Sequence, residues 1–300
     1  MIRVGCCGFP TSRDTYIKNF NMVELNSTFY KYPNDKTVKK WRSEVPAEFE
    51  FTVKAHQDIT HKFRFDLEAS IEPFERMKKI CKGLESAILV FQTPASFKPE
   101  FLEQATRFFG AVNREELILA WETRGPSWES REASESLKAS LEVLEVAHVT
   151  DPFKVMPVYV GRTAYFRLHG LGKDLYYYQY TDRELIRLHD LIKPFSIKCK
   201  QVYVLFNNLS MFEDAKRFQS LLREGKVPPL SKKKGLEAAK EILVRASFPT
   251  TKGTLMRKVG WRVIETEDNI QVRLAEIMEK ISPRTYKSAD DLISELEKKL

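Results

Sequence analysis

A repeated pairing of a short apolar run with a helical segment constrains the fold of this chain more than any other feature. Eight short runs rich in β-branched and aromatic residues each end near a polar residue, and most are followed by a loop and an amphipathic helical pattern. Such alternation predicts a parallel sheet, because parallel strands need a crossover connection. The predicted strands are Ile2–Cys7, Met22–Asn26, Phe49–Ala55, Ala87–Phe91, Leu117–Trp121, His148–Asp151, Ala164–His169 and Gln201–Phe206.

Eight such repeats within residues 1–222 are typical of a TIM (β/α)8-like barrel. An open doubly wound α/β sheet is the alternative, but the sequence lacks the glycine-rich loop of a nucleotide-binding sheet. Pro152 and Pro157 leave no room for a full helix between the sixth and seventh strands. We therefore expect a closed α/β barrel with one incomplete repeat.

The remainder of the chain predicts a separate module. Residues 223–235 have the Gly, Pro and Lys content of a linker. Four short helices are predicted beyond them, at Leu236–Ala246, Thr251–Val259, Asp268–Ile281 and Ala289–Leu300. The expected organisation is a barrel domain at residues 1–222, a linker at 223–235 and a small all-α module at 236–300.

The charge of the chain restricts its partners only weakly. The formal net charge is +8, and residues 231–300 hold 15 Lys and Arg against 11 Asp and Glu. This excess permits a phosphate-bearing or nucleic-acid partner but does not require one. No apolar run is long enough for a membrane span, and the first residues enter a strand without a signal-peptide pattern. We expect a cytoplasmic protein without a membrane partner, and the sequence leaves its oligomeric state open.

The residues that follow the predicted strand Leu117–Trp121 carry the most informative charges. Alternation places Glu122 and Arg124 on the same face as Ala120, whereas Trp121 points to the opposite face. Two opposite charges therefore leave one face of an otherwise apolar strand. In a TIM barrel the active site lies at the C-terminal ends of the strands, so we expect both charges at the mouth of the barrel.

Polar residues occupy equivalent positions at the other strand ends. They are Glu24, Asn26, Lys54, His56, Gln92, Asp151, Arg167, His169, Asn207 and Asn208. An ion-pair network that closes the barrel mouth is one explanation for such charges, and catalysis is the other. For the catalytic explanation we assign Glu122 as general acid or base, Asp151 as second carboxylate or orienting group, and His169 as proton shuttle.

The arginines among these residues indicate the kind of ligand. Glu24, Glu122, Asp151 and His169 would suit a divalent metal ion, but Arg124 and Arg167 would repel it. Two guanidinium groups instead favour bidentate contact with a carboxylate or phosphate. We therefore expect an anionic or sugar-containing small molecule, with no metal or other cofactor. Asn26 and Asn208 are expected to fix its hydroxyl or carbonyl groups.

Several motifs follow one another along residues 1–222. They are Val23–Tyr30, Thr60-His61, Phe91–Pro94, Glu122–Trp128, Asp151, Arg167–Gly170, Tyr178–Tyr180 and Tyr203–Asn208. In this order they resemble the signatures of the YecE-like family, domain of unknown function 72. The resemblance implies a TIM barrel but names no reaction. On these motifs, His61, Trp128 and Tyr180 join Glu24 and Asn207 as candidate substrate-binding residues.

Two further comparisons belong to the same resemblance. The chain has Cys6-Cys7-Gly8-Phe9 where the family tends to carry Thr-Ser-Gly-Trp. The tail around Phe248-Pro249, Leu255 and Tyr286 is weakly similar to a small helical domain of unknown function. The barrel itself is similar in shape to barrels that act on sugars and to apurinic endonucleases, which suggests a DNA-related role by analogy of fold alone.

The sequence therefore predicts an enzyme, a hydrolase or lyase that acts on a phosphate- or sugar-containing substrate, with nucleic acid among the candidates. The alternative is a non-catalytic nucleic-acid-binding protein that uses the basic tail and the tyrosines at Tyr176–Tyr180.

Overall fold

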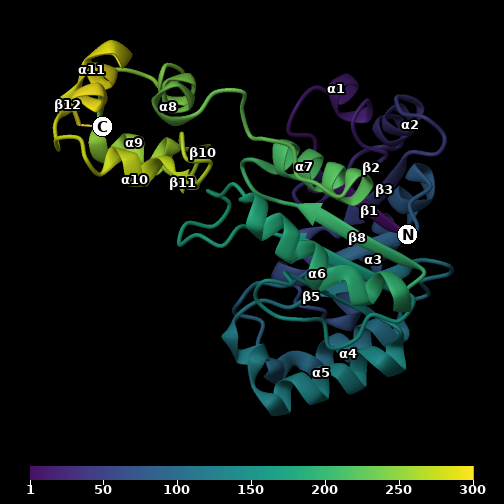
Figure 1. Ribbon diagram of the computed structural model, residues 1–300. Helices are drawn as coiled ribbons and strands as arrows, with labels where there is room; N and C mark the ends of the chain where they lie inside the picture. The colour runs from purple at the N-terminus through teal and green to yellow at the C-terminus, as the bar shows by residue number, and fades with distance from the viewer. Residues whose placement is uncertain (300) are drawn as a thin grey trace. The chain divides into compact units, whose positions relative to one another are not determined.

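The eight predicted strands form one parallel sheet in the computed structural model, which describes residues 1–299 (Figure 1). The sheet order is β1-β8-β7-β6-β5-β4-β3-β2, and an isolated parallel bridge between Cys7 and Glu24 joins its two edges. This closure makes the sheet a TIM-like barrel and excludes the open doubly wound alternative. The strands are β1 (Ile2–Cys6), β2 (Met22–Leu25), β3 (Glu50–Lys54), β4 (Ile88–Gln92), β5 (Ile118–Glu122), β6 (Ala147–Thr150), β7 (Thr163–Leu168) and β8 (Gln201–Phe206).

Helices follow most of the strands. They are α1 (Arg13–Ile17), α2 (Asp35–Ser43), α3 (Leu67–Leu84), α4 (Leu102–Ala111), α5 (Arg131–Leu144), α6 (Asp182–Lys198) and α7 (Met211–Glu224). Short 3-10 segments precede some of them, at η1 (Ser27–Phe29), η3 (Pro99–Phe101) and η4 (Pro126–Glu129), and η2 (Asp58–Lys62) is a π-helical turn. The chain between β6 and β7 forms turns rather than a helix, as Pro152 and Pro157 predicted.

The chain divides into two compact units. The first consists of Met1–Leu168 and Asp190–Asn207, and the second of His169–His189 and the chain from Asn208 onward. All eight strands of the barrel belong to the first unit. The sequence-based ranges 1–222, 223–235 and 236–300 follow composition rather than packing, and they stay predictions. We describe the two units separately.

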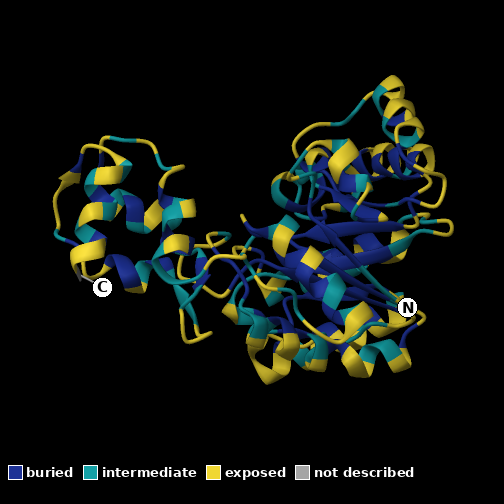
Figure 2. Ribbon diagram, turned by 45° about the horizontal axis from the view of Figure 1, so that its top comes forward, coloured by how far each residue is buried: buried dark blue, intermediate teal, exposed yellow. Residues whose placement is uncertain are grey.

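Alternation along each strand separates the barrel interior from its outer layer. Ala120 lies inside the barrel with an apolar cluster that includes Val90, Val149, Tyr165 and Leu205. Trp121 points the other way, which confirms the face assignment made from the sequence. The strands are almost wholly buried, whereas the helices expose one side (Figure 2).

The second unit contains the four helices predicted for the tail. They are α8 (Gly235–Leu243), α9 (Lys252–Val259), α10 (Leu274–Met278) and α11 (Ala289–Lys299), and they enclose a core of their own. Two short antiparallel pairs were not predicted: β9 (Thr250–Thr251) with β12 (Thr285–Tyr286), and β10 (Val263–Glu265) with β11 (Gln271–Arg273). The module is therefore helical with two small ladders, rather than all-α.

The predicted helix over Asp268–Ile281 is wrong in its first half. Asn269 adopts a left-handed backbone with φ of +62°, which asparagine tolerates better than most residues. The Thr266 amide donates to the Ile270 carbonyl at 2.8 Å and closes a turn there. This turn sends the chain back as a β-hairpin, and α10 begins only at Leu274.

None of the helices within residues 1–299 combines the length and apolar character that crossing a bilayer would require.

An aromatic cluster packs outside the sheet around Phe65. Its ring lies 5.1 Å from those of Phe108 and Phe109, 5.5 Å from Phe97 and 5.6 Å from Trp121, measured between centroids. Phe65 is fully buried although its φ is +65°, a strained value for a bulky residue. The packing of the ring therefore offsets the strain of the backbone.

We predict that Phe65→Ala lowers the free energy of unfolding by about 3–5 kcal/mol, because truncation leaves a cavity among rings that cannot collapse freely. Urea denaturation followed by circular dichroism measures this loss. Val143→Ala on α5 is the control, because Val143 is 84% exposed and the change should stay within about 0.5 kcal/mol. A loss below about 1 kcal/mol for Phe65→Ala would contradict the role given to this ring.

Candidate active site

A buried arginine joins three strand ends inside the barrel. Arg167 on β7 is 0% exposed, and its Nη2 donates to Glu24 Oε1 at 2.8 Å while its Nη1 donates to Glu122 Oε2. Burial alone would lower the pKa of Arg167, but the carboxylates of Glu24 and Glu122 raise it well above its ordinary value. The guanidinium therefore stays charged, and it fixes the side chains that leave β2 and β5.

Neighbouring groups complete the contacts of this arginine. The hydroxyl of Tyr165, two residues earlier on the same face of β7, donates to Glu24 Oε2 at 2.8 Å. Asn26 donates from Nδ2 to the Cys7 carbonyl at 3.1 Å, and its Oδ1 lies 3.4 Å from Arg167 Nη2. Both polar atoms of Asn26 thus have protein partners. Arg167 Nε is the one guanidinium nitrogen without a hydrogen bond.

Glu122 connects the buried arginine to a more accessible one. Its Oε1 accepts from Arg124 Nε at 2.7 Å, and the Arg124 side chain is 26% exposed whereas that of Glu122 is 7% exposed. Both oxygens of Glu122 therefore accept from guanidinium groups, an arrangement that favours the ionised carboxylate. This geometry matches the prediction that Glu122 and Arg124 leave β5 on one face.

Lys54 brings a perturbed amine to the same cluster. It ends β3, is 8% exposed, donates from Nζ to Gln92 Oε1 at 2.9 Å, and lies 4.1 Å from the centroid of the Phe29 ring. Burial, reinforced by the charge of Arg167, lowers the pKa of Lys54 to about 8. Roughly a tenth of this amine is neutral at pH 7, and that form can accept a proton.

His61 lies beside these cations. Burial lowers the pKa of its imidazole to about 4, and the charges of Lys54 and Arg124 contribute to the lowering. Thr60 Oγ1 lies 2.8 Å from His61 Nδ1, and the imidazole meets the Phe29 ring edge-on at 4.9 Å. His61 is therefore a neutral hydrogen-bonding group at the edge of the cluster at physiological pH.

Asp151 and Asn207 follow β6 and β8, the two strands that flank β7 in the sheet. Val149 on β6 pairs with Tyr165 on β7, so the same register places Asp151 level with Arg167. Asp151 is buried, and its Oδ1 accepts from the Phe153 amide at 3.1 Å. Asn207 follows β8, and its backbone amide donates to the Leu168 carbonyl at 2.8 Å.

Trp128 has a packing role in the structure. It is 6% exposed, its indole donates to the Phe97 carbonyl at 2.9 Å, and its ring meets that of Trp121 edge-on. These contacts hold the Trp128 side chain in the protein interior, and its binding role stays a prediction.

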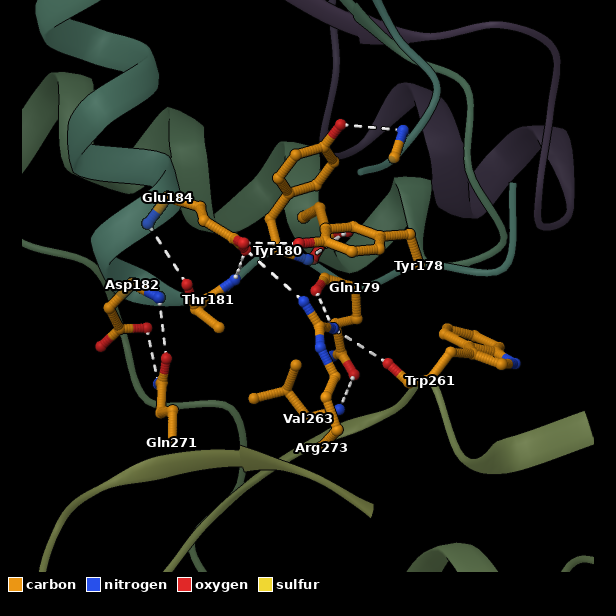
Figure 3. Close-up of polar contacts among 12 residues, drawn as sticks. Tyr178, Gln179, Tyr180, Thr181, Asp182, Glu184, Trp261, Val263, Gln271 and Arg273 are labelled. Atoms are coloured by element: carbon orange, nitrogen blue, oxygen red, sulfur yellow. Dashed lines mark hydrogen bonds and ion pairs between the residues drawn. The ribbon is translucent and has the colours of Figure 1, made fainter. Parts of the chain in front are cut away.

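Three further candidates, His169, Tyr180 and Asn208, belong to the second unit. Tyr180 is fully buried, and its hydroxyl accepts from the Gly170 amide at 3.0 Å (Figure 3). Asn208 donates to the Tyr178 carbonyl at 2.8 Å and to Asp214 Oδ2 at 2.7 Å. These contacts give Tyr180 and Asn208 structural roles. His169 is 5% exposed, with its ring centroid 5.8 Å from that of Tyr176.

Lys54 and Gln92 were recognised from the sequence as strand-end residues but were not chosen as site residues. The sequence signal that could have identified them as site residues was a polar side chain at the end of a predicted strand. For Lys54 that strand alternates between apolar and polar residues, and for Gln92 it is apolar. Their mutual hydrogen bond and the burial that perturbs Lys54 could not be inferred from one sequence. Within residues 1–299, no group of three or more His, Cys, Asp or Glu side chains is arranged to hold a metal ion.

The sequence matches the family model described as "Protein of unknown function DUF72" over residues 11–237. The UPF0759 protein YunF of Bacillus subtilis is 27% identical over 225 residues, which cover 65% of this chain and 79% of YunF. The UPF0759 protein YecE of Escherichia coli K12 is 30% identical over 104 residues, which cover 34% of this chain and 38% of YecE.

Crystal structures of DUF72 family proteins have the same fold. The protein from Enterococcus faecalis V583 aligns with a TM-score of 0.62 at 23% identity, over 74% of this chain and 98% of that protein. The protein from Thermotoga maritima MSB8 aligns with a TM-score of 0.59 at 25% identity, over 75% of this chain and all of that protein.

We predict that Arg167→Met lowers the free energy of unfolding by about 3–5 kcal/mol near pH 7, because buried Glu24 loses its guanidinium partner and Glu122 loses one of its two. The loss should shrink at acidic pH, since protonation of the carboxylates removes the uncompensated charge. Urea denaturation at several pH values measures both effects. Arg131→Met is the control, because Arg131 is 91% exposed in an ion pair with Glu135. A loss that does not depend on pH would contradict the ion-pair explanation.

We also predict that one lysine amine titrates near pH 8, because burial and Arg167 lower the pKa of Lys54 to about 8. Surface lysines should titrate near about 10.4. Nuclear magnetic resonance of isotopically labelled lysine side chains follows both groups. The low titration should vanish in Lys54→Met, and its persistence there would assign it to another residue.

Proposed function

The chain belongs to the DUF72 family, and from the chemistry of its barrel we propose that it is a hydrolase or lyase that acts on a phosphate- or sugar-containing substrate. The proposed active site is the cluster at the C-terminal ends of the strands, where TIM-barrel enzymes hold their catalytic groups. The proposal rests on residues of the first unit alone, so the predicted role of His169 does not enter it.

The observation that carries the proposal is the charge balance around Lys54. The charges of Arg167 and Arg124 are matched by those of Glu24 and Glu122 through direct ion pairs. Protonated Lys54 adds a buried positive charge, and its amine donates a hydrogen bond to the neutral amide oxygen of Gln92 rather than to a carboxylate. An anionic group of a substrate would compensate this charge, and a phosphate is the anion that Lys and Arg bind together most readily.

The contacts also suggest a role for each residue of the cluster. Arg167 is fully buried and already bound to two carboxylates, so it positions Glu122 rather than holding the substrate. Lys54 and the more accessible Arg124 are the proposed anion ligands. Glu122 and Asp151 remain the proposed carboxylates for proton transfer, and the neutral form of Lys54 is a further proton acceptor.

The test is turnover of a panel of phosphate monoesters, phosphodiesters and glycosides. We expect one class to be cleaved, and we expect Glu122→Gln and Lys54→Met to lower kcat/KM by about 10²–10⁴-fold, the range of general acid–base catalysis. Lys36→Met is the matched control, because Lys36 is an exposed lysine at the start of α2 whose loss removes the same charge.

Two results would overturn this proposal. Turnover that survives Glu122→Gln and Lys54→Met would place the reaction elsewhere. Absence of turnover, together with DNA binding that falls steeply with salt and survives Glu122→Gln, would favour the non-catalytic nucleic-acid-binding alternative.

A further inference from the structure

The second unit contains a cavity of about 390 Å³, within the size range of small-molecule sites. Its walls come from the end of α8, from residues 230–231, and from the segment Val259–Glu265. Ile242, Val259 and Val263 supply apolar surface, whereas Trp261, Arg245 and Arg262 supply an aromatic ring and two positive charges.

The carboxylates around this cavity already have cationic partners. Glu241 is paired with Lys233 at 3.3 Å and accepts from Ser231 Oγ at 3.1 Å. Glu265 is paired with Lys234 at 2.8 Å. Lysines, rather than the two lining arginines, are therefore the ion-pair partners of these two glutamates.

Both arginines line the cavity, and the charge of one acts on the other. Burial lowers the pKa of Arg262; Asp214 and Glu213 counteract that effect, and the charge of Arg245 adds to the lowering. Arg262 Nε is buried and makes no hydrogen bond to the protein. Two guanidinium groups at one cavity, one of them with an unused donor, favour an anion between them.

Trp261 provides a rigid aromatic wall next to these charges. Its indole Nε1 donates to the Lys258 carbonyl at 2.8 Å, and its own carbonyl accepts from Arg273 Nη1 at 3.0 Å. Arg273 in turn donates to the Gln179 carbonyl at 2.5 Å, and the Val263 amide donates to Gln179 Oε1 at 2.9 Å. This group of contacts holds the backbone of Trp261 in place. Figure 3 shows the indole directed away from these contacts.

We infer that this cavity binds a nucleotide unit, with the base against Trp261 and the phosphate between Arg245 and Arg262. A planar base stacks on an immobilised indole at little entropic cost. Every nucleobase has a ring face that can stack in this way. The phosphate would supply the acceptor that the two arginines lack. This inference is independent of the proposed function, because every residue that it uses belongs to the second unit.

The nucleotide unit could be a free nucleotide or part of a single strand, and one experiment distinguishes them. Adenosine monophosphate, adenosine, inorganic phosphate and a single-stranded oligonucleotide are titrated into the full-length protein by calorimetry. Adenosine and phosphate alone should each bind at least about tenfold more weakly than the monophosphate, because each lacks one of the two contacts. A free-nucleotide site binds the monophosphate at least as tightly as the oligonucleotide, whereas a strand-binding site prefers the oligonucleotide.

Substitutions assign the binding to this cavity. Arg262→Gln, Arg245→Gln and Trp261→Ala should each weaken the tighter of these ligands by about tenfold, and Trp261→Phe should largely preserve it. Arg257→Gln is the matched control: Arg257 is an exposed arginine of α9 that does not line the cavity. Glu122→Gln should also leave this binding unchanged, so the inference and the proposed function can fail separately.

The inference is overturned by any of three results. The monophosphate and the oligonucleotide both fail to bind; inorganic phosphate binds as well as the tighter ligand; or Arg257→Gln weakens binding as much as Arg262→Gln does. The last result would reduce the interaction to nonspecific attraction by a basic surface.

Discussion

A guanidinium group that water does not reach determines how the inside of this barrel is arranged. Arg167 is charged, and the energetic penalty of burying that charge is offset only because Glu24 and Glu122 contact it from two other strands. The two carboxylates depend on the arginine in the same way. Tyr165, Asn26 and Arg124 then take their positions from these three side chains. A second polar group, in which Arg3 and the Tyr203 hydroxyl both contact Glu50, lies at the opposite ends of the strands, and apolar side chains fill the barrel between the two.

The two buried cations of the layer are compensated differently. Arg167 has two anionic partners, whereas Lys54 has a neutral amide and an aromatic ring. The first arrangement fixes a charge, and the second leaves a charge that can be lost or neutralised by a ligand. This difference separates a residue that maintains the structure from one that is available for chemistry.

The period-two pattern of the strands was sufficient to predict the inner face of the barrel, since it placed Glu24, Glu122 and Arg167 there without knowledge of their partners. The pairing itself was not predictable. Arg167 lies 143 residues from Glu24 and 45 from Glu122 in the sequence, and the contacts depend on the stagger of a closed sheet. Arg167 was consequently expected to bind an anion from outside, although the protein supplies both of its carboxylates.

Aromatic and turn residues show the same limit. Trp128 and Tyr180 were chosen as candidate binding residues on the family motifs, and nothing in the sequence shows that their polar atoms bond to backbone groups. The helical spacing of apolar residues after Asp268 led to the prediction of a helix there, whereas Asn269 turns the chain at that point. In each case the decisive fact is a single local geometry rather than a repeated pattern.

The seam between β1 and β2 has a consequence for the order of assembly. In the described part of the chain these strands are joined by an isolated bridge, Cys7 to Glu24, and by the Asn26 side chain on the Cys7 carbonyl. The Tyr16 hydroxyl also links them, because it accepts from the Cys6 amide and donates to the Met22 carbonyl. Two of the residues that close the seam, Glu24 and Asn26, thus also contact Arg167. An open barrel would leave Arg167 without one of its carboxylate partners, so the charged site would be incomplete in a partly folded chain. Closure of the sheet therefore also completes the charged layer.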